Sequence, residues 1–164
     1  MAAIDVGPGA KNLTSALSGY TIVDKANPAN LDGTIDHLDV RIKDYTSGTI
    51  DLAAFFVVSG DNLSTRGTAT GLTPVTGDND FDAPGDFTAF AIDAGDYLGI
   101  WVPPDNIALD MESPGAGFWY LPSPNGIPST NRKFFALAAV VAIYGTGVTA
   151  AVPGDDILIM GFGF

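Results

Sequence analysis

The chain has 164 residues, of which 46% are hydrophobic, and its formal net charge is −12. This length suits a single domain with a sizeable core, and so large a hydrophobic fraction argues against disorder. The negative charge argues against nucleic acid as a partner, because binding to phosphates needs clustered Lys and Arg, and the absence of cysteine excludes disulfides, thiolate catalysis and cysteine metal sites.

The acidic residues also indicate the fold class. Glu112 is the one Glu among 19 acidic residues, and all the others are Asp. Asp is common in turns because its short side chain bonds to nearby backbone amides, whereas Glu favours helix interiors. The composition therefore favours strands joined by loops over helices.

Residues 1–19 are rich in Gly, Ala and Ser and show little hydrophobic periodicity. We expect them to form an N-terminal arm or extended lead-in, followed by one domain over residues 20–164. The first residues lack the basic start and the apolar run of a secretory signal, so no signal peptide is expected.

Alternating hydrophobicity predicts strands along the rest of the chain. In residues 33–43, Leu38, Val40 and Ile42 alternate with charged residues, which predicts a strand buried on one face. Ile35 is out of phase with this set, so we expect a bulge or a strand-entry contact there. Further strands are expected at residues 20–23, 49–58, 66–72, 87–92, 97–102, 106–111, 118–121, 134–144 and 157–164.

Residues 134–144 form the longest apolar stretch, with 11 residues. A membrane span needs about 20 residues, so we expect a buried strand here and no membrane partner. Frequent short strands bounded by Gly, Pro and Asp are typical of a sandwich or barrel. The sequence thus predicts an all-β fold: a single jelly-roll-like antiparallel β-sandwich with about nine or ten strands.

An acidic stretch at residues 77–86 is one candidate site. Carboxylates of Asp78, Asp80 and Asp82 alternate there, and such oxygens can converge on a hard cation such as Ca²⁺. The pattern is not that of an EF-hand, because Ala83 occupies the position that requires Gly and no Glu closes the loop. The alternative is a solvated turn between two strands, with Phe81 pointing inward, and no other metal or cofactor is expected.

Aromatic residues suggest a second site. Trp101, Trp119 and Tyr120 lie near a Pro-rich loop, and aromatic platforms beside Asp and Asn often hold sugar rings. In alternating strands such residues are more often core or subunit interface. Since residues 118–120 are consecutive aromatics, at least one ring of the three faces the other way.

The case for catalysis is thin, and no catalytic residue is assigned. His37 is the one histidine and lies on the polar face of its strand, with no Gly-x-Ser-x-Gly motif in the chain. Asp110 and Glu112 are two residues apart on one strand face, which would suit a glycosidase pair, but a polar strand edge is the simpler interpretation. We therefore expect a protein that is not an enzyme.

The two ends of the chain suggest contacts between molecules. Residues 157–164 are apolar on both faces, and a strand of this kind must be covered within the sheet or by another subunit. Together with the N-terminal arm, this predicts a homo-oligomer. The candidate oligomer or capsid contacts are Ile4, Val6, Ile157, Ile159, Phe162 and Phe164.

Three short motifs resemble a module of tailed-phage virion proteins. They are Ala-Asn-Pro-Ala-Asn-Leu-Asp-Gly-Thr-Ile at residues 26–35, Asp-Ala-Gly-Asp-Tyr-Leu-Gly-Ile at residues 93–100 and Ile-Tyr-Gly-Thr-Gly at residues 143–147. They occur in the same order as in that module. The resemblance implies a jelly-roll-like, lectin-like sandwich that decorates capsids or sits in tail fibres, with no catalytic residues to carry over.

A short chain of this kind suits a capsid decoration or cement protein better than a tail fibre. The resemblance implies a homotrimer on the capsid surface of a virion, synthesised in the host cytoplasm and bound to a major capsid protein through residues 1–19. The alternative is a carbohydrate-binding module of a phage fibre or cell-surface assembly, which would use Trp101, Trp119 and Tyr120.

Overall fold

The computed structural model describes residues 2–149. Within this range the chain forms fifteen strands and no helix, and so it contains no helix long and apolar enough to cross a membrane. Every pairing between these strands is antiparallel. The predicted all-β, antiparallel class is confirmed, and the strand expected at 157–164 lies outside the described residues.

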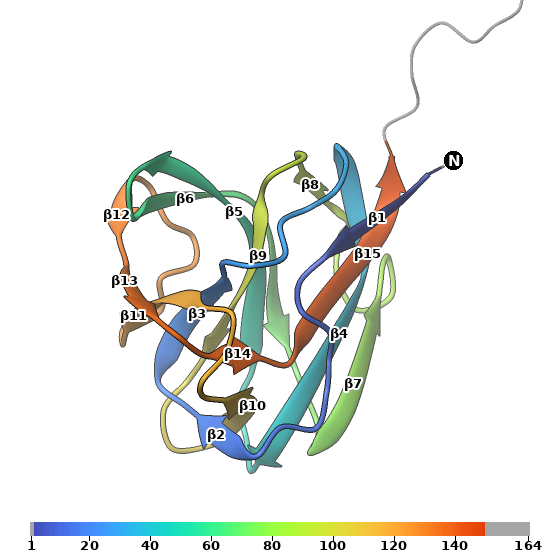
Figure 1. Ribbon diagram of the computed structural model, residues 1–164. Coiled ribbons are helices and arrows are strands. Elements are labelled where there is room, and N and C mark those ends of the chain that lie inside the picture. The colour runs from blue at the N-terminus through green and yellow to red at the C-terminus, as the bar shows by residue number, and fades with distance from the viewer. Residues whose placement is uncertain (1, 150–164) are drawn as a thin grey trace, which may run out of the picture.

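The strands form two sheets that face each other as a sandwich (Figure 1). Sheet A has the order β1-β15-β4-β10-β14, with β2 added to β10 and with β7 and β8 added to β4, and sheet B has the order β12-β6-β5-β9-β3-β11-β13. The strands of sheet A are β1 (Ala3–Val6), β2 (Ser15–Leu17), β4 (Gly33–Tyr45), β7 (Gly77–Asp82), β8 (Phe90–Ile92), β10 (Ile107–Glu112), β14 (Val140–Val141) and β15 (Ile143–Thr149). Those of sheet B are β3 (Tyr20–Asp24), β5 (Ile50–Ser59), β6 (Asn62–Leu72), β9 (Tyr97–Val102), β11 (Phe118–Pro122), β12 (Arg132–Lys133) and β13 (Phe135–Leu137).

The number of strands exceeds the nine or ten expected. Nine of the strands in residues 2–149 have five or more residues, and the remaining six have two to four. Alternation over so few residues gives no usable periodicity, so the short strands are not visible in the sequence. The finer jelly-roll assignment stays a prediction.

Strand β4 runs through the middle of sheet A and follows the predicted pattern. Leu38, Val40 and Ile42 are buried, while the charged residues between them lie on the outer face. The register with β15 shifts between Thr146 and Gly147, opposite the step from His37 to Ile35. Ile35 is nevertheless fully buried. The bulge expected at Ile35 is therefore confirmed, and it returns an out-of-phase side chain to the core.

Two apolar clusters hold the sandwich together. The larger lies between the sheets and contains the inward side chains of β4, β5, β9 and β15. The smaller lies on the outer face of sheet B, where Phe134 and Ile127 pack over Phe55 and Trp119. Gly99 on β9 makes this packing possible, because a Cβ there would lie 2.6 Å from the ring of Phe55. The segment of residues 122–134 thus acts as a lid over this face.

The N-terminal residues do not lead into the domain as a separate arm. Strand β1 pairs with β15, and β2 pairs with β10, so both lie in sheet A. Ile4 and Val6 are fully buried in the core. The expected division into an arm at residues 1–19 and a domain at residues 20–164 therefore does not describe the fold. Strands β1 and β2 belong to the same sandwich as the strands that follow them. Gly7, Pro8 and Gly9 follow β1 and break the alternation, which conceals this in the sequence.

The apolar stretch at 134–144 is not one buried strand. Phe134 is buried, but Phe135 and Leu137 on β13 are 51% and 47% exposed. After β13 the chain crosses from sheet B to sheet A and continues as β14 and β15. A single hydrophobic run therefore serves an edge strand, a crossover and the start of an inner strand.

Candidate functional site

Charged side chains line the outer face of sheet A where β7 pairs with β4. The register places three Asp of β7 opposite three residues of β4: Asp82 faces His37, Asp80 faces Asp39 and Asp78 faces Arg41. Residues two apart on a strand share a face, so these six side chains lie together on the outside.

This stretch was expected to be either a Ca²⁺ loop or a solvated turn. Residues 77–82 form strand β7 instead, because pairing with β4 gives their backbone a regular hydrogen-bonded ladder. Phe81 points inward and is 7% exposed, as the turn interpretation expected. The turn follows at residues 83–86, where the Asp86 carboxylate accepts a hydrogen bond from the backbone N–H of Asp82 at 3.0 Å.

The structure divides the three candidate Ca²⁺ ligands. Asp78 lies 2.6 Å from Nη1 of Arg41, so its charge is already paired. Asp80 and Asp82 approach His37 Nδ1 at 3.4 and 2.7 Å. Ligand atoms of these three residues lie within 4.8 Å of one another, so within residues 2–149 His37, Asp80 and Asp82 form a group that could hold a metal ion. The sequence predicts that His37 lies on the polar face of its strand, but it gives no sign that β7 pairs beside this face.

Protonation of His37 competes with any such metal ion. The hydrogen bond with Asp82 raises the pKa of His37 above its ordinary value, partial burial opposes the rise, and the charges of Asp39 and Asp80 add to it. Asp39 also lies 3.3 Å from Nε2. A protonated imidazole cannot ligate a cation, so the arrangement stabilises a charged histidine among carboxylates.

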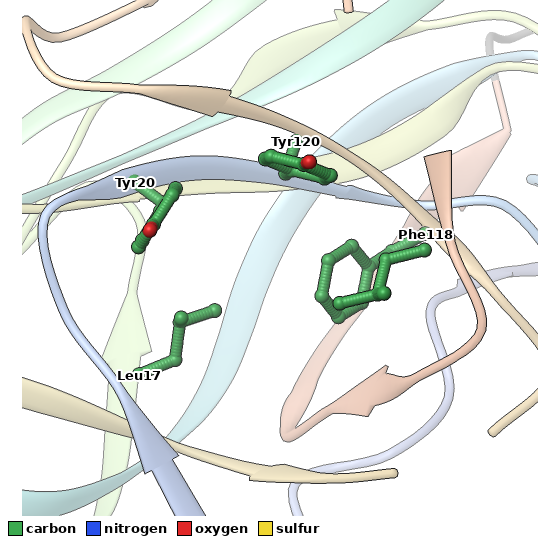
Figure 2. A pocket seen from close by; sticks show the side chains of 5 residues that line it. Leu17, Tyr20, Phe118 and Tyr120 are labelled. Atoms are coloured by element: carbon green, nitrogen blue, oxygen red, sulfur yellow. The ribbon is translucent and has the colours of Figure 1, made fainter. Parts of the chain in front are cut away.

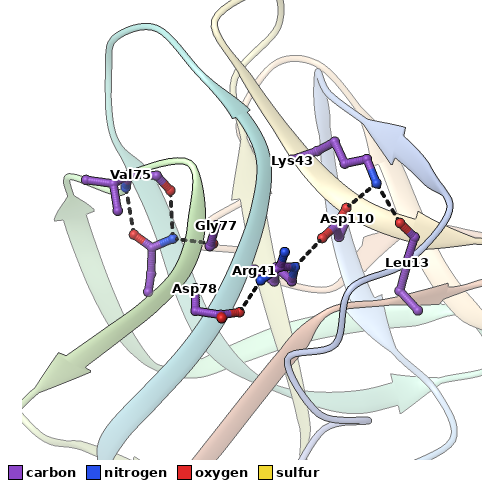
Figure 3. Close-up of polar contacts among 8 residues, drawn as sticks. Leu13, Arg41, Lys43, Val75, Gly77, Asp78 and Asp110 are labelled. Carbon is purple, nitrogen blue, oxygen red and sulfur yellow. Dashed lines mark hydrogen bonds and ion pairs between the residues drawn. The ribbon is translucent and has the colours of Figure 1, made fainter.

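Asp110 on β10 is the centre of an ion-pair network (Figure 3). Its side chain is 1% exposed and lies 3.0 Å from Nε of Arg41 and 3.2 Å from Nζ of Lys43. Lys43 also donates to the backbone carbonyl of Leu13 at 2.6 Å, which ties the N-terminal segment to the network. Neither Asp110 oxygen accepts a well-aligned hydrogen bond. Arg41 and Lys43 therefore balance the negative charge of Asp110 as nearby cations rather than as well-directed hydrogen-bond donors.

This burial argues against the carboxylate pair considered from the sequence. Asp110 is enclosed by its two cations, whereas Glu112 lies beside an open hollow that also includes Lys11 and Asn27. A glycosidase needs both carboxyl groups at one accessible bond. Asp110 is a structural ion-pair residue, and nothing in the local sequence pattern distinguishes it from an exposed strand Asp.

The three candidate sugar-binding residues do not share one surface. Trp119 is 3% exposed, and its Nε1 donates to Asp61 Oδ1 at 2.8 Å. Trp101 is half-buried and packs against the same outer cluster of sheet B. Tyr120 points the opposite way, into the space between the sheets. The expectation that one consecutive ring faces away is confirmed, and the proposed platform does not form.

The inward aromatic rings line a pocket of about 180 Å³ at one edge of the sandwich (Figure 2). Leu17 comes from sheet A, and the remaining walls, Tyr20, Phe118, Tyr120 and Leu137, come from sheet B. Tyr120 makes edge contacts with Tyr20 and Phe118, with ring centroids 5.9 and 6.4 Å apart. The pocket is therefore lined mainly by apolar groups and is open to the outside.

Strand β13 borders this pocket and is the last strand of sheet B. It pairs with β11 on one side, and no described strand pairs with its other side. Phe135 stacks at a tilt on Tyr120, with ring centroids 5.6 Å apart, and both Phe135 and Leu137 are about half exposed. We call the pocket together with β13 the open apolar edge.

The predicted contact residues fall into two groups. Ile4 and Val6 are core residues of the same chain and present no surface to a partner, which corrects their assignment as contacts. Buried and exposed residues alternate in β1 because the strand pairs with β15 in sheet A and turns one face to the core. Ile157, Ile159, Phe162 and Phe164 lie outside the described residues.

No match to this chain was found among protein-family models, curated proteins or solved structures. Its likeness to phage virion modules therefore stays a prediction from three short motifs. The features of residues 2–149 that bear on function are the acidic face around His37, the buried Asp110 and the open apolar edge at β13.

Proposed function

We propose that this protein is a non-catalytic structural protein that works as a homo-oligomer, with the open apolar edge as its contact surface. The observation that carries this proposal is the pair Phe135 and Leu137, half exposed beside an aromatic pocket on β13, which among the described strands pairs on one side only. Proteins normally protect sheet edges, and an exposed apolar edge usually marks a surface that a partner covers.

Within this class we propose a capsid decoration or cement protein, most simply a trimer. The support for this role is the resemblance of residues 26–35, 93–100 and 143–147 to phage virion modules. The acidic outer face of sheet A is compatible with it, because a surface with a large negative charge keeps an assembled particle soluble. Carbohydrate binding through Trp119 has less support, since that ring is buried.

Sedimentation equilibrium of the purified protein over a wide concentration range tests the oligomer. We expect a closed oligomer that dissociates on dilution, and a monomer for Phe135→Asp, because a buried charge at the contact is costly. The matched control is Val75→Asp, since Val75 is 58% exposed in the connection between β6 and β7. A wild-type protein that stays monomeric at every concentration overturns the proposal.

Immunogold labelling of native particles with antibodies against the sandwich tests the decoration role. Gold distributed over particle heads is the expected result. Gold confined to tails or filaments would place the protein elsewhere in an assembly and overturn the decoration role while leaving the oligomer intact.

A further inference from the structure

We propose that His37, Asp80 and Asp82 bind a divalent transition-metal ion of the zinc type on the outer face of sheet A. The inference concerns a different surface from the open apolar edge and does not depend on the proposed oligomer. Two of these ligands are among the three residues from which the sequence suggests a Ca²⁺ site. The third is an imidazole, which changes the class of ion that the group would select.

The three ligands are held by two paired strands rather than by a loop. Asp82 lies opposite His37 in the register of β7 with β4, and Asp80 is two residues away on the same face of β7. Nδ1 of His37 lies 3.4 Å from Oδ1 of Asp80 and 2.7 Å from Oδ1 of Asp82. The strand pairing thus brings one nitrogen and two carboxylate oxygens together without a change in the backbone.

These separations are close to those that a bound ion requires. Zn²⁺ binds a His nitrogen at about 2.0–2.1 Å and a carboxylate oxygen at about 2.0–2.2 Å, so two ligands of a tetrahedral ion lie about 3.4 Å apart. The Asp80 oxygen already lies at this distance from Nδ1. The Asp82 oxygen must move away from Nδ1 by about 0.7 Å to reach it. Because the Asp82 side chain is 71% exposed, a small rotation is enough.

Asp39 supplies the outer contact that metal-bound histidines usually have. Its Oδ1 lies 3.3 Å from Nε2 of His37, the ring nitrogen that Asp80 and Asp82 do not approach. A metal-bound imidazole generally gives its second N–H to a carboxylate or carbonyl, which fixes the tautomer and raises the basicity of the ligating nitrogen. Asp39 is therefore a positioning residue, and it leaves Nδ1 as the atom that binds the ion.

The local charge also favours a cation. The carboxylates of Asp39, Asp80 and Asp82 surround one imidazole. Arg41, which follows on the outer face of β4, is already engaged by two other carboxylates, at 2.6 and 3.0 Å. A divalent ion would compensate two of the three negative charges around His37, and like charges this close together are otherwise unfavourable.

The ligand set selects the class of ion. Ca²⁺ takes about six to eight oxygen ligands, whereas imidazole suits Zn²⁺ and Ni²⁺. Three protein ligands leave the remaining coordination positions to water, so we expect reversible binding of one ion per chain. Among the described strands β7 pairs only with β4. An ion shared by His37 and Asp82 therefore fastens β7 to the centre of sheet A.

Calorimetric titration of the untagged, full-length protein with ZnCl₂ at pH 8 tests the site. We expect saturable binding of one ion per chain. Asp39→Asn should weaken this binding by about 10- to 100-fold, which is typical for loss of an outer contact, and His37→Gln and Asp82→Asn should weaken it further. The matched control is Asp78→Asn, which removes a carboxylate from the same face of β7, but one that Arg41 pairs. It should bind Zn²⁺ as wild type does.

Two further measurements identify the ligand and the ion. The chain has one histidine and no cysteine, so one set of imidazole NMR signals reports on His37, and Zn²⁺ should shift it. Zn²⁺ should also raise the urea midpoint of wild type and of Asp78→Asn but not that of His37→Gln, whose cooperative unfolding without metal shows that it is folded.

The remaining outcomes would overturn the proposal. A wild-type protein without saturable Zn²⁺ binding has no such site. If His37→Gln binds Zn²⁺ as tightly as wild type, carboxylates alone attract the ion. If a modest excess of CaCl₂ displaces Zn²⁺, the group does not select transition metals.

Discussion

Replacing Asp110 with Asn should destabilise the protein by about 3 kcal/mol. Removing one partner of a buried ion pair typically costs about 3–5 kcal/mol, because the remaining charge stays buried without compensation. Here the side chains left behind, Arg41 and Lys43, are 24% and 34% exposed, so water partly replaces the lost carboxylate. Arg41 also keeps Asp78. The cost should therefore fall at the low end of that range.

Urea unfolding followed by tryptophan fluorescence measures this cost, provided that the slope with denaturant is unchanged. The matched control is Asp78→Asn, which removes a carboxylate from the same guanidinium, but one that is 78% exposed. An exposed pair contributes about 1 kcal/mol or less and weakens with salt. If the two variants lose the same free energy of unfolding, or if salt affects both equally, then burial of Asp110 does not determine its contribution and the reasoning fails.

Two further predictions concern protonation and packing. The hydrogen bond with Asp82 raises the pKa of folded His37 above 6.5. Wild type should therefore lose its stability advantage over His37→Gln as pH rises from 6.5 through the folded pKa. In urea titrations, a stability advantage that grows over this pH range would contradict the prediction. Gly147→Ala should cost about 3 kcal/mol, because its Cβ would lie 1.8 Å from the carbonyl oxygen of Thr34. Gly85→Ala, whose Cβ would lie 3.7 Å from the nearest atom, is the control, and equal melting temperatures for the two variants would refute the steric argument.

Local alternation was sufficient to predict the central strand and its irregularity. Leu38, Val40 and Ile42 define one face of β4 because a one-residue slip would expose all three. The same argument locates the bulge, since Ile35 reaches the core only if the strand gains a residue there. Where one face is buried and the other is charged, the sequence contains enough information to determine the strand.

The acidic stretch and Asp110 show where that information ends. Asp and Gly at residues 77–82 favour a turn, but pairing with β4 overrides this local preference. Asp110 has the same sequence context as an exposed strand Asp, and its burial accompanies the pairing of β10 with β4, which brings Arg41 and Lys43 beside its carboxylate. Both outcomes depend on which strands become neighbours, and local periodicity does not encode this.

The two faces and the edge of the sandwich together constrain how copies can meet. The outer face of sheet A is charged around His37, and stacking two such faces would bring carboxylates together. Residues 122–134 cover the outer face of sheet B and supply Ile127 and Phe134 to its cluster, so that face is also closed. The crossover after β13 brings the chain to sheet A without covering Phe135 and Leu137. The proposed association through this edge would leave the acidic outer face of sheet A free, which is compatible with the proposed role on the surface of a particle.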